Sequence, residues 1–263
     1  MGRRYIFVAG CPRSGTTALA TMLNWGAEVF IGQERFANLL KRSPDLFETS
    51  LFQRNRFGTI APGDCGYATF EESGDWNVWY AAMKDLSAYE QYSVVGDKIT
   101  GLYEQYSRFA DSEWIAEDIR IVQILRKPQD VVASYERRRL DSSDNWDKGF
   151  AEGIADWVNS IHVAAEQYRY RSTRFRFHVV LYESLFEDGP GKMIRGAKKL
   201  FESLELEFGD SQLEGLDKMY QNTLARKEKR TDINAEWEST VNSRIDRETH
   251  KQYEYLKDLA LFL

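Results

Sequence analysis

The sequence has few of the residues on which metal-binding and disulfide-stabilised proteins depend. Its 263 residues include only two cysteines, Cys11 and Cys65, and three histidines. Two cysteines form no disulfide framework, and the scattered histidines lack the spacing of metal ligands. We therefore expect no metal site and a reducing compartment.

Long apolar runs are also missing. No stretch reaches the roughly 20 apolar residues that a membrane-spanning helix needs. No charged-then-apolar leader precedes the apolar run that starts at Tyr5. We expect a cytoplasmic protein with no transmembrane segment. A linker rich in Pro, Gly or Ser is absent too, which predicts a single domain over 1–263 with one large core.

An overall excess of basic residues is absent as well. The formal net charge is −6, which argues against nucleic acid or another general polyanion as a partner. Basic clusters at 137–139, 169–176 and 226–230 are local exceptions. Such clusters are more often solvated surface than binding sites.

The most informative absence is a single lysine in residues 10–17. These residues read Gly-Cys-Pro-Arg-Ser-Gly-Thr-Thr. They keep the spacing of the phosphate-binding loop GxxxxGK[ST], except that Thr16 stands where the lysine belongs. Because that lysine contacts the β- and γ-phosphates of ATP or GTP, its replacement indicates a different nucleotide.

The flanking residues place this loop between a strand and a helix. The apolar run 5–9 predicts a strand buried on both faces of a parallel sheet, and the apolar spacing in 16–25 predicts a helix. Amide groups at a helix N-terminus favour an anion. Near Gly15, the guanidinium group of Arg13 adds to this preference for an anion. The hydroxyl groups of Ser14, Thr16 and Thr17 add further hydrogen-bond donors. A glycine-rich turn without a ligand is the alternative.

Strands and helices alternate along the rest of the chain. Strands are expected at 28–31, 94–98, 119–125 and 178–182, and helices at 33–41, 103–115, 128–140, 146–170, 192–203, 212–222 and 243–261. Residues 44–92 predict an insertion that either shapes a pocket or simply packs, and 224–237 predict a polar loop. This alternation predicts an α/β fold, a P-loop-like three-layer sandwich with a mainly parallel sheet, which binds ligands at the carboxyl ends of its strands.

Cationic groups follow three of the predicted strands. They are the loop at 10–17, Lys98 and Arg126, which the topology places at the same edge of the sheet. Ser134 and Arg138 share a face of the helix after Arg126 because they are four residues apart. Alone, this pair would be ordinary helix surface. Beside the loop, it predicts a second anion site, which a nucleotide with phosphates on both its 5′ side and its ribose would need.

These motifs resemble those of sulfotransferases that use 3′-phosphoadenosine 5′-phosphosulfate (PAPS). In that family a lysine-less GxPRSGTT-type loop binds the 5′-phosphosulfate, which matches residues 10–17. An arginine followed eight residues later by a serine binds the 3′-phosphate, which matches Arg126 and Ser134. The resemblance extends from residue 5 to about residue 185. It is closest to the bacterial, tyrosylprotein and carbohydrate branches.

Further positions carry weaker parts of the resemblance. Arg138 has the spacing found in the tyrosylprotein branch. Residues 181–185 are similar to the family's YE-L segment, which implies that Tyr182 lies near the nucleotide. A late basic loop closes over the 3′-phosphate in the family, which points to Lys229 or Arg230.

The resemblance also implies a reaction without a metal. A sulfuryl group passes in line from PAPS to a hydroxyl of an unidentified acceptor, a glycan, lipid, phenol or peptide, and leaves 3′-phosphoadenosine 5′-phosphate (PAP). The cytosolic branch uses a histidine base after a Lys-Thr pair, but no histidine follows Lys98 here. Other branches use a glutamate after the first helix, which matches Glu34. Glu34 is therefore the expected base, with its pKa adjusted by neighbours such as Arg35, while Lys98 and Arg13 stabilise the transferring group and its phosphate.

Two other functions stay open, as does the role of Glu34. A glutamate at a helix start is also a common surface acid, stabilised there by about 0.3–1 kcal/mol. A small-molecule or nucleotide kinase would use the same strand, loop and helix, although Thr16 and Arg126 replace its lysine and its magnesium-binding aspartate. A nucleotide-binding protein without turnover is the second alternative.

Overall fold

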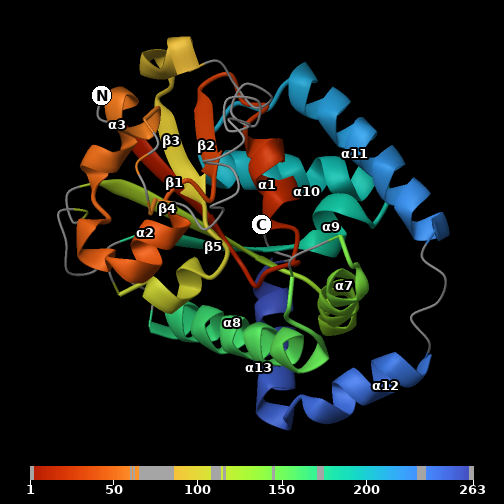
Figure 1. Ribbon diagram of the computed structural model, residues 1–263. Helices are drawn as coiled ribbons and strands as arrows, with labels where there is room; N and C mark the ends of the chain where they lie inside the picture. The colour runs from red at the N-terminus through yellow and green to blue at the C-terminus, as the bar shows by residue number, and fades with distance from the viewer. Residues whose placement is uncertain are drawn as a thin grey trace. The chain divides into compact units, whose positions relative to one another are not determined.

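The computed structural model describes residues 3–59, 61, 63–64, 86–107, 114, 117–143, 146–170, 175–229 and 235–260. Five parallel strands form a sheet that is flanked by helices (Figure 1), which confirms the predicted α/β fold. The chain divides into two compact units. Unit 1 comprises residues 1–9, 16–122 and 172–178, and unit 2 comprises 10–15, 123–171 and 179–263.

The strands follow the order β2-β3-β1-β4-β5 across the sheet. Their bounds are β1 (Arg4–Ala9), β2 (Val29–Gln33), β3 (Val94–Lys98), β4 (Asp118–Leu125) and β5 (Arg176–Leu181). In the parallel register, Lys98 of β3 is the partner of Val8 in β1 and of Gln33 in β2. The carboxyl ends of these three strands therefore lie at one edge, and the loop at residue 10 starts directly after β1.

The strands β1 and β4 are almost completely buried, and most of their side chains are apolar. In β1 every residue after Arg4 is buried, and in β4 every residue after Asp118 is buried. This is the pattern of parallel strands covered on both faces. Gly96 of β3 lies so close to β1 that a Cβ atom there would be 1.7 Å from the carbonyl oxygen of Ile6.

Aromatic rings fill the core of unit 1. They meet mostly edge to face with centroids about 5–6 Å apart, the arrangement that ring quadrupoles favour. The rings belong to Tyr5, Phe7, Phe36, Phe47, Phe52 and Trp114. The Trp114 indole also donates a hydrogen bond of 2.9 Å to the carbonyl of Phe47. The described start of the expected 44–92 insertion thus contributes to core packing.

The helices differ in length between the two units. Those of unit 1 are α1 (Thr16–Leu23), α2 (Ala37–Arg42), α3 (Arg54–Phe57) and the 3₁₀ helices η1 (Pro44–Leu46), η2 (Thr49–Phe52), η3 (Leu86–Gln91) and η4 (Leu102–Gln105). Those of unit 2 are α7 (Pro128–Leu140), α8 (Phe150–Tyr170), α9 (Tyr182–Phe186), α10 (Pro190–Ser203), α11 (Asp210–Lys229), α12 (Ala235–Arg244) and α13 (Arg247–Ala260). Within unit 2, α8 packs against α7 and α13, and α10 packs against α9 and α11 (Figure 1).

Some predicted helices have different bounds in the structure. The helix expected at 33–41 begins only at Ala37, because β2 continues to Gln33 and a turn follows. The helix expected at 103–115 is, in its described part, the short η4, and most of its remainder lies outside the described residues.

The polar loop expected at 224–237 is wrong for all of its described part. Helix α11 continues to Lys229, and α12 begins at Ala235. Residues 225–229 are Ala-Arg-Lys-Glu-Lys, all strong helix formers without an apolar face, so propensity maintains a helix that periodicity does not reveal. The last helix expected at 243–261 is α13, which starts at Arg247 after a break behind α12.

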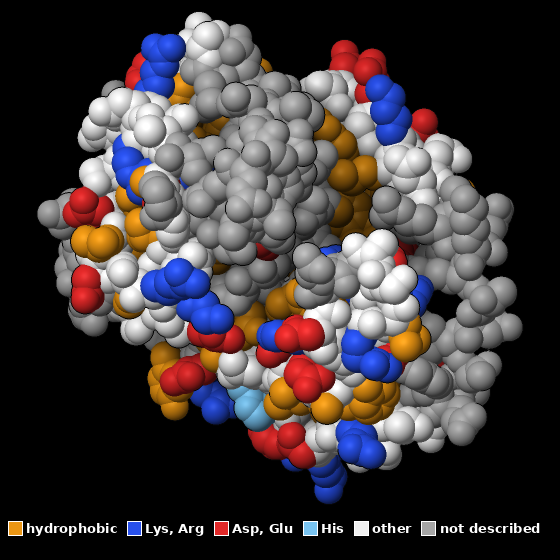
Figure 2. All heavy atoms as spheres, in the orientation of Figure 1, with side chains coloured by type: hydrophobic (Ala, Val, Ile, Leu, Met, Phe, Trp, Pro, Cys, Tyr) orange, Lys and Arg blue, Asp and Glu red, His pale blue; other side chains and the backbone are white. Residues whose placement is uncertain are grey.

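The charges on the surface and the lengths of the helices relate to two expectations: that the protein is no general polyanion binder, and that it has no transmembrane segment. Lysine and arginine side chains alternate with aspartate and glutamate over the described surface of the face in Figure 2. The expectation that the protein is no general polyanion binder stays a prediction. None of the described helices is both long and apolar enough to span a membrane.

We expect the replacement Gly96→Ala to destabilise the protein by about 3 kcal/mol, because a backbone carbonyl cannot move aside as a side chain can. Chemical denaturation measures the change in the free energy of unfolding. Gly191→Ala is the control, because its Cβ would meet only Arg195, at 3.7 Å. A Gly96→Ala protein as stable as the control would show that β1 and β3 are not packed so closely.

Candidate functional site

The loop of residues 10–15 has a backbone that few residue types accept. Gly15 has a φ of +102°, and a Cβ there would be 2.3 Å from the ring of Tyr182. Arg13 adopts a φ of +71°, in the left-handed region that non-glycine residues rarely occupy. The turn is closed by the Ser14 amide, which donates to the Cys11 carbonyl at 3.0 Å. The Tyr182 ring and the loop therefore fix each other's position in unit 2.

Arg13 connects the loop to helix α7. Its Nε donates a hydrogen bond of 2.9 Å to Oγ of Ser134. Arg126, which follows β4, directs Nη1 to the carbonyl of Arg13 at 3.4 Å. The structure thus brings together the loop and two residues of the predicted second anion site, which are far apart in the sequence.

Arg126 is a buried cation held between an aromatic ring and two carboxylates. Only 5% of the residue is exposed, and its guanidinium lies 4.0 Å from the centroid of the Tyr182 ring. Glu187 accepts from it at 3.4 Å, and Asp130 lies 3.8 Å away. These contacts orient the guanidinium and leave it only partly balanced, because both ion pairs are long.

Glu183 lies beside Arg126, and Arg138 makes an aromatic contact of its own on α7. The amide of Lys127 donates to the carboxylate of Glu183 at 2.9 Å, and burial raises the pKa of that carboxyl above its ordinary value. Arg138, half-buried on α7, lies 4.5 Å from the ring centroid of Trp146. Tyr182, Arg126 and Arg138 thus all take part in cation–π contacts.

The loop also contains an unused hydrogen-bonding group. Ser14 is 1% exposed, and its Oγ has no hydrogen-bond partner among the residues that the structure describes. A buried hydroxyl without a partner is energetically unfavourable and commonly marks a ligand position. Thr16 and Thr17 begin α1, where Thr16 is buried and Thr17 is exposed. The group of loop hydroxyls, amides and arginines can hold oxyanions.

A second cluster in unit 1 surrounds Glu34, in the turn after β2. Glu34 has a φ of +58°, and its amide donates to the carbonyl of Lys98 at 2.7 Å. Its Oε1 accepts from Nζ of Lys98 at 2.8 Å and from Oγ1 of Thr100 at 2.7 Å. The side chains of Lys98 and Glu34 are 5% and 14% exposed, so this is a largely buried ion pair. The two expected catalytic residues are therefore in direct contact.

Asp97 is a residue of this cluster that the sequence analysis missed. Its Oδ1 accepts from the amide of Arg35 at 3.1 Å, and its Oδ2 accepts from the amide of Phe36 at 2.9 Å. The residue is completely buried, and burial raises the pKa of its carboxyl to about 7, although the two amide hydrogen bonds oppose this rise. The available sequence signal was an aspartate inside the predicted strand 94–98, directly before Lys98.

The side chain of Arg35 has its hydrogen-bond partners in residues 56–64. Its completely buried guanidinium donates to Oδ2 of Asp64 and to the carbonyl of Phe57. Asp64 also accepts two hydrogen bonds from Arg56. Arg35 thus ties the turn after β2 to residues 56–64, and its expected effect on the pKa of Glu34 stays a prediction.

Other predicted positions cannot be located. Lys229 ends α11, but its side chain, like all of Arg230, lies outside the described residues, as does Cys65. Among the described residues no three His, Cys, Asp or Glu side chains are arranged to hold a metal ion.

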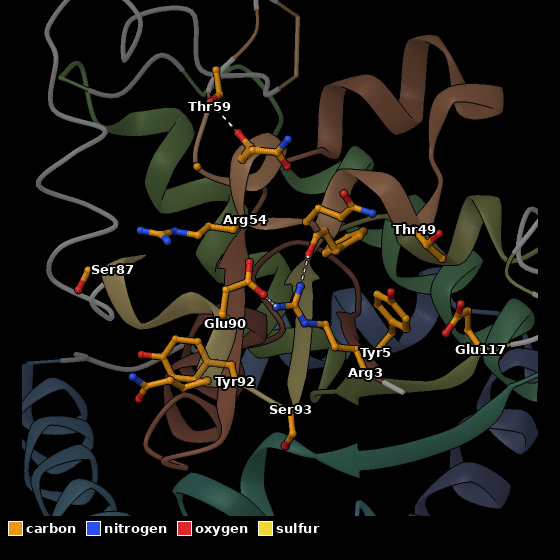
Figure 3. A pocket seen from close by; sticks show the side chains of 15 residues that line it. Arg3, Tyr5, Thr49, Arg54, Thr59, Ser87, Glu90, Tyr92, Ser93 and Glu117 are labelled. Atoms are coloured by element: carbon orange, nitrogen blue, oxygen red, sulfur yellow. Dashed lines mark hydrogen bonds and ion pairs between the residues drawn. The ribbon is translucent and has the colours of Figure 1, made fainter. Parts of the chain in front are cut away.

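A cavity in unit 1 lies at the other edge of the sheet. It has a volume of about 1390 Å³ and is lined near the amino ends of β1, β3 and β4 by residues that include Arg3, Tyr5, Arg54, Glu90, Ser93 and Glu117 (Figure 3). Arg3 is paired there with Glu90 at 2.5 Å. None of the candidate site residues lines this cavity, so its size carries no argument about the chemistry.

Comparisons with known proteins agree with the motifs. The profile of the sulfotransferase family matches residues 5–210, and the chain belongs to this family. No curated protein sequence matches it.

Solved structures show the same fold at low sequence identity. The sulfotransferase domain of the Synechococcus PCC 7002 olefin synthase has a TM-score of 0.54 and 18% identity, over 97% of this chain and 95% of that one. A sulfotransferase from Alicyclobacillus acidocaldarius has a TM-score of 0.54 and 16% identity, over 99% and 96% of the two chains. The sulfotransferase domain from the curacin biosynthetic pathway has a TM-score of 0.51 and 19% identity, over 81% and 77%.

We expect Asp97 to make stability fall as pH rises from about 4 to 7. Its pKa is about 7 in the folded protein and 3.8 without burial, so between these values only the folded protein binds the proton. Lys98 favours ionisation of Asp97, and Glu34 opposes it.

Chemical denaturation at pH 5 and pH 8 measures this effect against the variant Asp97→Asn, which lacks the titrating group. From pH 5 to pH 8 the wild-type protein should lose of order 2 kcal/mol of stability relative to the variant. A difference between the two proteins that stays constant with pH would contradict the raised pKa.

Proposed function

We propose that this protein transfers a sulfuryl group from PAPS to a hydroxyl group of an acceptor. The single observation that carries the proposal is the contact between the lysine-less loop and α7, in which Arg13 donates to Ser134 beside the buried Arg126. Two sets of oxyanion-binding groups meet there, as a donor with a 5′-phosphosulfate and a 3′-phosphate requires. Membership of the sulfotransferase family supports it.

The donor would be held by groups of the loop and of the residues around Arg126. The 5′-phosphosulfate would take the loop amides around Gly15, the unpartnered hydroxyl of Ser14 and the side chains of Arg13, Thr16 and Thr17. The 3′-phosphate would take Ser134 and the cations of Arg126 and Arg138. Tyr182, already stacked on Arg126, would lie near the nucleotide. Lys229 or Arg230 would close over the 3′-phosphate.

Glu34 is proposed as the base. The acceptor oxygen forms a bond to sulfur while the bond from sulfur to the bridging oxygen of the 5′-phosphate breaks, and Glu34 takes the acceptor proton. Lys98 stabilises the negative charge that grows on the bridging oxygen. When Glu34 becomes neutral, its attraction for Lys98 weakens, which frees the ammonium group for the leaving phosphate.

Backbone strain supports these two positions. Only three non-glycine residues in the described chain have a positive φ, namely Arg13, Glu34 and Glu205. Such a conformation costs of order 1 kcal/mol or more and persists where surrounding contacts hold it. That two of the three are proposed catalytic residues favours a functional origin of the strain.

Ligand-induced thermal stabilisation tests the donor. We expect PAP to raise the melting temperature without magnesium, since the proposed phosphate ligands are all side chains and amides of the protein. PAP at 100 times its Kd should add about 2.7 kcal/mol. ATP should have little effect, because Thr16 replaces the lysine that binds its phosphates. Stabilisation by Mg-ATP alone would favour a kinase and contradict the proposal.

Arg126→Ala should weaken PAP binding about tenfold to hundredfold, because charge-assisted hydrogen bonds contribute about 1.5–3 kcal/mol. Isothermal titration calorimetry measures the Kd. The matched control is Arg137→Ala, which removes an exposed arginine of α7 and should leave the Kd unchanged. Equal effects of both variants would remove Arg126 from the donor site.

Glu34→Gln should reduce turnover by about 10²–10⁴-fold, since a positioned general base contributes this much. PAP affinity should remain at the wild-type value. The rate of PAP release from PAPS reports turnover. The control Glu104→Gln neutralises an exposed glutamate of η4 in the same unit. Wild-type turnover in Glu34→Gln would exclude Glu34 as the base.

A further inference from the structure

We propose that Asp97 is a positioning residue that holds Glu34 in the conformation in which it acts. The inference rests on the proposed role of Glu34 as the base and extends it to a residue that touches neither donor nor acceptor. It starts from two hydrogen bonds, because the Asp97 carboxylate accepts from the amides of Arg35 at 3.1 Å and Phe36 at 2.9 Å.

These two amides belong to the turn between β2 and α2. Phe36 is the residue before α2, and no side chain of its own caps that helix. The first-turn amides of Asn38 and Leu39 donate to the carbonyl of Asp64. Asp97 accepts instead from the two amides that precede the helix, with one carboxylate oxygen for each. The peptide groups directly after Glu34 are thereby fixed by a completely buried side chain.

Glu34 needs such support because its backbone is in the left-handed region, at a φ of +58°. The strand end of β3 holds Glu34 at three other points. The carbonyl of Lys98 accepts from its amide at 2.7 Å, and Lys98 Nζ and Thr100 Oγ1 donate to its carboxylate at 2.8 and 2.7 Å. Asp97 holds the backbone amides of the two residues that follow Glu34, while the Arg35 side chain ties the same turn to Phe57 and Asp64.

The surroundings leave room for this carboxylate. A Cβ atom on Gly32 would lie 2.8 Å from Oδ1 of Asp97 and 2.8 Å from the ring of Phe57. A side chain at position 32 would therefore displace the Asp97 carboxylate or the Phe57 ring. Gly32 in β2 leaves the space, and Asp97 in β3 supplies the carboxylate, for the two hydrogen bonds to the turn.

The test is a double-mutant cycle of Asp97→Asn and Glu34→Gln. Asparagine has the size of aspartate but replaces one acceptor oxygen by an NH₂ group, which cannot accept the amide it faces. The rate of PAP release from PAPS is measured with water or an added alcohol as acceptor, and the Kd of PAP is measured by calorimetry.

We expect Asp97→Asn alone to lower kcat about tenfold to hundredfold and to leave the Kd of PAP within twofold of wild type. In the Glu34→Gln background the same change should lower kcat by less than twofold, because Asp97 has no base left to position. A purely structural role would reduce the rate by the same factor in both backgrounds and would overturn the inference, as would an Asp97→Asn protein with wild-type kcat.

Failure of the proposed function gives different results. If Glu34→Gln itself keeps wild-type turnover, the base assignment is wrong. If PAP does not bind the wild-type protein, the donor assignment is wrong.

A measurement on the wild-type protein covers the case in which Asp97→Asn does not fold. The amide protons of Arg35 and Phe36 should be protected from hydrogen exchange by at least 100-fold relative to unstructured peptide at neutral pH. Exchange of both amides at the unprotected rate would show that Asp97 does not hold the turn and would overturn the inference.

Discussion

The parallel pairing of β3 with β1 and β2 is the constraint on which the rest of the structure depends. It sets Lys98 opposite both Val8 and Gln33, so that the ends of three strands coincide. The turn with Glu34 follows one of these strands, and the lysine-less loop follows another. The pairing leaves no space for a side chain at Gly96, where the backbones of β1 and β3 approach most closely. Within unit 1 the candidate residues Glu34 and Lys98, 64 positions apart in the sequence, thus come into contact where their strands end.

Burial of charge is the second feature of the proposed site. Lys98, Asp97 and Arg126 are each at most 5% exposed, and burying a charge without partners is costly. Each has partners that satisfy it in part: Glu34 for Lys98, two amides for Asp97, and Tyr182 with Glu187 for Arg126. Charges held in fixed places in a water-poor environment need no reorganisation when charge develops in a reaction. The strained conformations of Arg13 and Glu34 have the same effect, because the geometry is established before a ligand arrives.

The sequence predicts the fold and the loop well for physical reasons. The apolar residues 5–9 are buried in a strand of the sheet, as such a run predicts. A helix begins at Pro128, at the predicted place. Glu34, Lys98, Arg126 and Ser134 were predicted because short motifs contain them. The structure adds that Glu34 contacts Lys98 and that Arg13 contacts Ser134.

The features that the sequence did not predict depend on contacts or propensities that short motifs do not encode. Asp97 is recognisable only once β3 is placed beside the turn at Arg35 and Phe36, and the partner of Arg35 is Asp64, 29 residues away. The end of α11 was missed because helix propensity, rather than an apolar face, extends it to Lys229. The acceptor is a different case, since sequence motifs describe the donor only.

The most direct test of the central claim is transfer of a labelled sulfuryl group. The protein is incubated with PAPS carrying ³⁵S and separate panels of glycans, phenols, lipids and tyrosine peptides, and the products are identified by mass spectrometry. We predict a sulfated hydroxyl product, formed together with an equal amount of PAP by the wild-type protein and nearly absent with Glu34→Gln. Phosphorylated products from ATP, with no sulfated product from PAPS, would contradict the account.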